Sequence, residues 1–297
     1  MFARITRMLL SALLVLPGAL WAEAKIDRPP LWQVSANGQR AYLLGSFHFG
    51  TAAMYPMPAV VEQAFAASDM LVVEIDLTAI DAVAASRLII AQGLYPQPEQ
   101  SLRQHLDDDS WALLVRFGED LGLPIEYLQR QKPWLAFMTL SQRLYQDLGY
   151  SEKLGVDLHF LERAHQQAKQ VVELETFEGQ IMLLDQLSEQ EQVALLTETL
   201  LDFEQARAQA EQLANNWRQG ELEAMDKLIN GWFAEKPGLQ RVQQVLLYDR
   251  NQAMAARTAE LLEQGGKPFV VVGAGHLIGA GSVVDVLRAQ GYQVERL

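Results

Sequence analysis

The sequence predicts an α/β protein with a central mixed β-sheet, strand-end Gly-x-x-His motifs and large helical insertions. Strand-like runs alternate with helices near both ends of the chain, and two long helical blocks lie between them. Two of the strand-like runs lead directly into a Gly-x-x-His sequence. No Ser/Gly/Pro-rich linker divides the chain, so we expect residues 25–297 to form a single domain.

Residues 1–24 have the layout of a secretory signal peptide. Arg4 and Arg7 precede an apolar run over residues 8–16, and Ala22-Glu23-Ala24 supplies small residues for cleavage. The run is shorter than the roughly 20 residues that span a bilayer, although an uncleaved anchor is the alternative interpretation. We therefore expect a periplasmic protein whose mature chain has no membrane span.

The first elements after this segment are strands. Residues 31–36 and 39–44 flank Asn37-Gly38, the pair that most strongly predicts a hairpin. A helix is expected over residues 58–68, and a buried strand over residues 69–75. The next helix should cover residues 78–92, with Thr78 as its cap.

The rest of the chain is mostly helical until its last thirty or so residues. Helical insertions are predicted over about 96–169 and 177–265, separated by a strand at 170–175. A strand at 268–273, a helix at 282–290 and a strand at 292–296 complete the expected sheet.

Three side chains at predicted strand ends suggest chemistry. His48 and His276 each follow an apolar strand in a Gly-rich turn, and Glu74 lies near the end of the strand at 69–75. Ligand sites in α/β sheets lie at the carboxyl ends of strands, and a buried carboxylate needs a partner or a metal. The sequence thus favours a His₂-carboxylate site for a divalent metal. Structural hydrogen bonds for the histidines and an ion pair for Glu74 stay as alternatives.

Other polar residues are weaker candidates. His159, Glu162 and His165 are spaced by three, but the neighbouring apolar stripe predicts that they form a solvated or partly covered helix face. His105, which Asp107 and two further aspartates follow, resembles a helix entry cap.

Three charged residues have two interpretations each. Glu173 and Glu175 point to one face of a strand, and either supports the site or forms a salt bridge. Arg250 lies in a helical context that favours a structural ion pair over polarisation of a substrate carbonyl.

Composition excludes several classes of protein. The net charge of −13 argues against nucleic acid or anionic lipid as the main ligand. The absence of cysteine excludes disulfides, thiolate metal sites and a cysteine nucleophile, and suits an oxidising compartment. The chain contains no HExxH, GxSxG, P-loop or GxGxxG motif.

An ordered set of short motifs resembles the TraB/GumN family, which includes the Tiki-type membrane proteases. The two Gly-x-x-His segments are residues 43–48 and 272–277. Between them lie Val73-Glu74-Ile75-Asp76, Lys132-Pro133-Trp134, Gly155-Val156-Asp157, Leu174-Glu175-Thr176 with Gln180, and Arg250-Asn251. Ser46 departs from the threonine usual in the family but keeps the hydroxyl group.

The resemblance implies an α/β fold and a metalloprotease-like site. Tiki-type members are regarded as manganese or cobalt proteases that depend on two histidines and a glutamate, which correspond here to His48, His276 and Glu74. We therefore expect a periplasmic metal-dependent hydrolase, with peptide hydrolysis as the favoured reaction and zinc as an alternative metal. Glu74 would be a third ligand or a general base. The competing hypothesis is a non-catalytic envelope protein that binds haem, a metal or a peptide in the same cleft. The substrate and the oligomeric state stay open.

Overall fold

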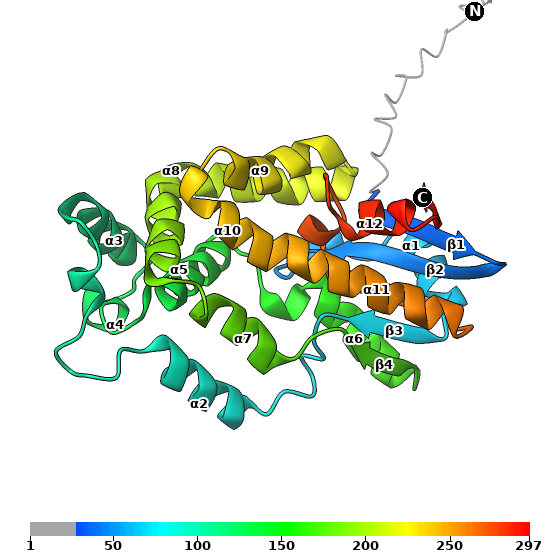
Figure 1. Cartoon of the computed structure of the whole chain (residues 1–297), viewed down its shortest axis with the longest axis horizontal. Helices are drawn as coiled ribbons and strands as arrows, with labels where there is room; N and C mark the ends of the chain where they lie inside the picture. Colours follow the sequence, from blue (N-terminus) through cyan, green and yellow to red (C-terminus); the bar gives the residue numbers. More distant parts are fainter. Residues whose placement is uncertain (1–27) are drawn as a thin grey trace, which may run out of the picture.

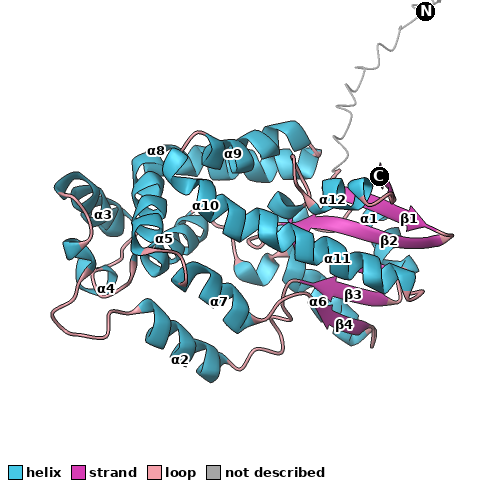
Figure 2. Cartoon of the chain, in the orientation of Figure 1, coloured by secondary structure: helices cyan, strands magenta, loops and turns pink. Residues whose placement is uncertain are grey.

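The computed structural model describes residues 28–297 and contains a mixed six-stranded sheet beside a large helical part (Figures 1 and 2). The strands are β1 (Leu31–Ala36), β2 (Gln39–Ser46), β3 (Met70–Val73), β4 (Gln170–Glu173), β5 (Pro268–Gly273) and β6 (Gln293–Arg296). Their order is β4-β3-β5-β2-β1-β6. β1 runs antiparallel to β2 and β6, whereas β2, β3, β4 and β5 pair in parallel. The predicted fold class is confirmed, and the predicted signal peptide lies outside the described residues.

The β1–β2 hairpin forms where the sequence predicts it. Asn37 and Gly38 have φ angles of 52° and 80°, the left-handed conformation that a tight two-residue turn requires. The turn sets the register in which Leu31 pairs with Leu44. This register directs the apolar side chains of both strands into the core.

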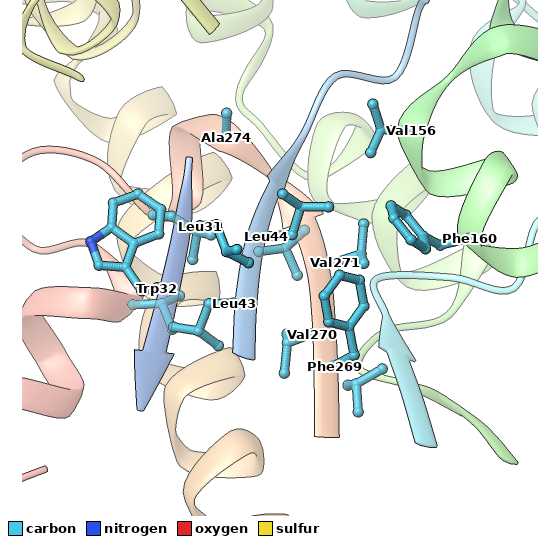
Figure 3. Packing of buried hydrophobic residues seen from close by; sticks show 14 of the residues in the cluster. Leu31, Trp32, Leu43, Leu44, Val156, Phe160, Phe269, Val270, Val271 and Ala274 are labelled. Carbon is cyan, nitrogen blue, oxygen red and sulfur yellow. The ribbon is translucent and has the colours of Figure 1, made fainter. Parts of the chain in front are cut away.

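Helices cover both faces of the sheet. The helices α1 (Ala59–Ala67) and α6 (Val156–Gln166) lie behind it in Figure 1, and α11 (Asp249–Glu263) and α12 (Val283–Ala289) lie in front. The rings of Phe65, Phe160 and Phe269 pack with centroids 5.0–5.4 Å apart and join α1 and α6 to β5. Because both faces are covered, β5 is a continuous apolar run that is almost fully buried (Figure 3).

The helical part contains helices from both predicted insertions together with α2 (Ala82–Gly93), whereas α6 and α11 of the insertions lie against the sheet. Its other helices are α3 (Asp108–Asp120), α4 (Ile125–Leu128), α5 (Pro133–Asp147), α7 (Phe177–Asp185), α8 (Glu189–Gln219), α9 (Leu222–Ala234) and α10 (Gln240–Gln243). Short 3-10 segments are η1 (Ala52–Met54), η2 (Leu102–Gln104), η3 (Glu152–Leu154), η4 (Pro237–Leu239) and η6 (Ala274–His276). The long helix α8 begins with a Ser188/Glu191 capping box and ends at Gly220, whose φ of 70° suits glycine.

Two predicted helix starts are wrong. The helix expected at Thr78 begins at Ala82, because Asp81 accepts the free N–H groups of the first turn while Thr78 bonds to Asp76. His105 does not cap α3. The cap is Asp107, which accepts the Ser110 N–H group, and His105 contacts a glutamate of α8.

Two strands are shorter than predicted. β3 ends at Val73 and β4 ends at Glu173. Two more backbone bonds, from Leu174 N–H to Val73 and from Glu175 N–H to Glu74, follow before the Asp76 N–H group donates to the Glu173 carboxylate. Within residues 28–297, no helix is long and apolar enough to cross a membrane.

The loop after β2 is held by a close backbone approach that we expect to be sensitive to substitution. Gly50 and Ser151 exchange two backbone hydrogen bonds of 2.9 Å, and a Cβ atom on Gly50 would lie 1.7 Å from the Leu154 carbonyl oxygen. Gly50→Ala should therefore lower the free energy of unfolding by about 1–3 kcal/mol, measured by urea denaturation.

Gly231→Ala is the matched control. Gly231 lies inside α9. A Cβ atom added to it would lie 3.6 Å from its nearest neighbour, Cγ of Lys227. This substitution should raise the free energy of unfolding by up to about 1 kcal/mol. Equal stabilities for the two variants would contradict the described loop packing.

Candidate functional site

Three neighbouring parallel strands deliver the predicted site residues to one edge of the sheet. Ser46 of β2 pairs with Gly273 of β5, and Val73 of β3 pairs with Val271 of the same strand. His48 and Glu74 follow β2 and β3 directly, and His276 lies in the η6 turn after β5. The carboxyl ends of parallel strands share one edge, which is where α/β proteins bind ligands.

The three side chains converge above Gly273. A Cβ atom on this glycine would lie 3.2 Å from Nε2 of His48, 3.4 Å from Oε1 of Glu74 and 3.6 Å from Cδ2 of His276. Nε2 of His276 is 3.9 Å from Oε1 of Glu74. The structure thus brings together all three residues that the sequence singles out, and the missing side chain of Gly273 leaves them room.

His48 is oriented by Asp157, at the start of α6. Nδ1 of His48 lies 2.9 Å from Oδ2 of Asp157, whose Oδ1 accepts a 2.7 Å bond from the Ser46 hydroxyl group. A carboxylate only accepts, so Nδ1 carries the proton and the neutral imidazole has its lone pair on Nε2. The charge of Asp157 raises the pKa of His48 to about 9, although the His48 side chain is 56% exposed.

His276 is oriented in the same way by Asn251 of α11. Nδ1 of His276 lies 2.7 Å from Oδ1 of Asn251, and the Asn251 amide nitrogen donates to the Gly281 carbonyl oxygen at 2.9 Å. That second bond fixes the orientation of the amide, so Nδ1 of His276 donates and Nε2 carries the lone pair. Burial lowers the pKa of His276 to about 4, although the nearby Glu74 opposes this shift.

Glu74 uses its two oxygens differently. Oε1, on the side of the histidines, accepts the Gly273 N–H group at 2.7 Å. Oε2 accepts from Arg250 at 2.6 Å and from Gln180 at 3.0 Å. Burial raises the pKa of Glu74, but the neighbouring positive charges and the Gly273 bond outweigh burial and lower the pKa to about 2. The carboxylate is therefore ionised at neutral pH.

Arg250 joins Glu74 to a second carboxylate. Its Nε and Nη2 atoms each lie 2.7 Å from an oxygen of Glu175, and Nη1 donates to the Leu246 carbonyl oxygen at 3.0 Å. The guanidinium and both carboxylates are largely buried. Arg250 thus forms the expected ion pair, and Glu175 supports the site through it. Glu173 is instead bonded to the backbone of Asp76.

A π-helical segment precedes the residues that α11 supplies. This segment, η5 (Gln244–Tyr248), joins α10 to α11, and Arg250 and Asn251 lie in the first turn after it. A π turn changes the direction in which the following side chains point, and such turns are frequent at functional sites. No pattern in the sequence predicts it. Asp157, Asn251 and Gln180 have no predicted role either, and their only signal is their place in the family-like motifs.

The spaced trio on α6 forms no common site. His159 packs its ring against Tyr55 with centroids 4.6 Å apart, and Glu162 is exposed. Nε2 of His165 is bonded to Asp76 and to Thr78. The predicted solvated or partly covered face is confirmed, since Glu162 and His165 are exposed and His159 is half-buried.

A pocket of about 290 Å³ opens at the convergence point. Its lining includes His48, Phe49, Tyr145, Gly273 and His276. Within residues 28–297, no group of three or more His, Asp or Glu side chains is arranged closely enough to hold a metal ion as it stands.

The sequence matches the model of a known protein family. The model of the TraB/PrgY/gumN family matches residues 30–296. The chain belongs to this family. The resemblance inferred from the motifs is confirmed, and the match extends over nearly all the described residues.

The relatives include bacterial and animal proteins. "Uncharacterized protein YbaP" of Escherichia coli (strain K12) is 28% identical over 272 residues, which cover 91% of this chain and 97% of YbaP. "Metalloprotease TIKI1" of Danio rerio is 28% identical over 313 residues, which cover 89% of this chain and 62% of the relative. "Metalloprotease TIKI1" of Homo sapiens is 26% identical, with 61% of its length covered. The match thus spans less than two thirds of these Tiki proteins. No solved structure matches significantly.

The Asp157–His48 pair predicts a pH-dependent contribution to stability. The pKa of His48 is raised from its ordinary value of 6.5 to about 9, so the protonated ring favours the folded state. This contribution is complete below about pH 6.5 and is lost as the pH rises through about 9.

Asp157→Asn keeps the hydrogen-bond acceptor and removes the charge. In chelator-treated protein, urea unfolding should show the largest loss of stability near pH 6, and the loss should shrink by about pH 9.5. Asp120→Asn, at an exposed position on α3, is the control and should show no such trend. A constant difference across this pH range would contradict the charge pairing.

Proposed function

We propose that the protein is a metal-dependent hydrolase that acts on peptides, with His48 and His276 as ligands of a divalent cation and Glu74 as the third ligand. The observation that carries this proposal is the matched orientation of the two imidazoles. Each Nδ1 atom donates to a fixed acceptor, so Nε2 is the nitrogen of each ring that faces Oε1 of Glu74 and can bind a cation, in His48 after loss of its proton. The metalloprotease names of the Tiki relatives support the same reaction class.

The donor set suits a divalent cation. Imidazole nitrogen with carboxylate oxygen is a ligand combination that zinc, manganese and cobalt accept in proteins. Around the convergence point, the carboxylates of Asp157, Glu74 and Glu175 outnumber the Arg250 guanidinium. This excess of negative charge favours a cation. Manganese or cobalt is the metal that the resemblance implies, and zinc is the alternative.

The acid–base state of the three residues fits ligand roles. A divalent cation supplies Lewis acidity, which polarises a carbonyl group and acidifies water. Glu74 is ionised, and His276 is neutral, so both bind a cation near pH 7 without first losing a proton. His48 has to release its proton. Oε1 of Glu74 faces the histidines and lies 3.9 Å from Nε2 of His276, so we assign Glu74 as a ligand in preference to a general base.

Substitution of the three residues tests this assignment. His48→Ala and His276→Ala should each lose most of the bound metal, measured by elemental analysis, together with peptide hydrolysis. Glu74→Gln keeps the shape of the side chain. If Glu74 is a ligand, its loss should also reduce metal content, whereas loss of a general base would keep the metal and slow turnover by roughly 10²–10⁴-fold.

His105→Ala is the matched control, since His105 lies in the helical part and contacts Glu189. It should keep the wild-type metal content and activity. Full metal content in both His48→Ala and His276→Ala would rule out the site. Metal that depends on these histidines in a wild-type protein without hydrolysis would favour the envelope binding protein over the hydrolase.

We also propose that the protein works in the periplasm on a peptide or another envelope component. The support is the arrangement of Arg4, Arg7, the apolar run and Ala22-Glu23-Ala24. N-terminal sequencing of the exported protein should begin near Glu23 or Lys25. Intact Met1 in a membrane fraction would contradict cleavage and indicate an anchor.

A further inference from the structure

A second pocket lies beside the candidate site, in the helical part. This apolar groove has a volume of about 350 Å³ and lies between α5, α8 and α9. Tyr145, Leu213 and Ile229 line both the groove and the pocket at the histidines. The two hollows therefore lie side by side and share a wall.

The walls of the apolar groove are unusual for a protein surface. Phe137, Leu228, Trp232 and Phe233 line it, and each is only partly buried. Concave clusters of apolar side chains that stay in contact with solvent mark binding sites. The volume is at the lower end of the roughly 300–1,000 Å³ found for small-ligand pockets, which suits side chains better than a large cofactor.

The acidic group beside these walls already has partners. Oδ2 of Asp202 accepts the Trp232 indole N–H group at 2.6 Å and lies 2.9 Å from Nζ of Lys236. A charged side chain entering the groove would lose its hydration and find no free countercharge among these groups. The groove consequently discriminates in favour of apolar side chains.

Residues of the wall that the two pockets share also contact the segments that carry His48 and His276. Cγ2 of Ile229 would lie 3.3 Å from a Cβ atom on Gly275, which directly precedes His276. The Tyr145 ring stacks on Phe49, next to His48, with centroids 5.0 Å apart. An extended chain with a carbonyl group at the histidines would thus cross Tyr145 and Ile229 before it enters the groove.

We propose that the apolar groove binds large apolar side chains of a peptide substrate, such as Leu or Phe, beside the bond that the histidine site cleaves. This inference rests on the proposed hydrolase function and adds its substrate class. The wall that the two pockets share and the pairing of Asp202 with Trp232 and Lys236 carry it.

Binding can be tested separately from turnover. Two fluorescein-labelled decapeptides would be compared by fluorescence anisotropy on His48→Ala, one with a Leu-Phe pair at its centre and one with Ser-Ser. The Leu-Phe peptide should bind at least about tenfold more tightly, because burying one large apolar side chain has an effect of this size. Equal affinities would overturn the inference.

Substitutions in that background place the binding in the groove. Leu228→Glu should weaken binding of the Leu-Phe peptide by about tenfold or more, and Leu228→Met should retain it. Leu201→Glu is the matched control, because Leu201 is 59% exposed on α8 and does not line the groove. An equal loss in Leu228→Glu and Leu201→Glu would overturn the assignment of the groove.

Hydrolysis by the wild-type protein separates the two proposals. Cleavage of both peptides at equal kcat/KM would overturn the groove inference and leave the hydrolase intact. Selective binding of the Leu-Phe peptide without cleavage of either peptide would support the groove and contradict the hydrolase.

Discussion

The parallel pairing of β5 with β2 on one side and β3 on the other is the constraint on which the site depends. Parallel neighbours end at the same edge of a sheet, so residues far apart in sequence meet there only if their strands pair this way. The pairing also requires helices on both faces of β5, which explains its uninterrupted apolar sequence. Gly273 ends the strand, and its missing side chain leaves space for His48, Glu74 and His276.

Burial of Arg250 between two carboxylates is the second constraint. Removing one partner from such a pair leaves an uncompensated buried charge, which typically costs about 3–5 kcal/mol. Glu74 thus has two roles, since Oε2 holds Arg250 while Oε1 lies beside the histidines. The same guanidinium ties α11 to Glu175, just beyond β4. The packing of α11 and the charge of the candidate site are therefore linked.

Part of this arrangement follows from local sequence rules. The Asn37-Gly38 turn and the apolar run of β5 determine their own conformations, and two Gly-x-x-His segments after buried strands indicate a shared edge. Local sequence rules do not predict the hydrogen-bond partners of the histidines, because Asp157 and Asn251 come from helices whose position depends on tertiary packing. Local rules also do not decide between two possible caps for one helix. Either Thr78 or Asp81 could cap α2, and Asp81 does so while Thr78 bonds to Asp76. The π-helical segment before Arg250 has no counterpart in the residue pattern.

The family relationship and the geometry both support the hypothesis that His48 and His276 bind the same divalent cation. Anomalous X-ray scattering from crystals soaked in manganese chloride tests it most directly, because the signal locates the ion without reference to activity. We expect one strong peak above Gly273 with Nε2 of both histidines in its coordination shell and Glu74 as a neighbour. A peak elsewhere, for example at Asp76 and His165, or no peak between two well-ordered imidazoles, would contradict it.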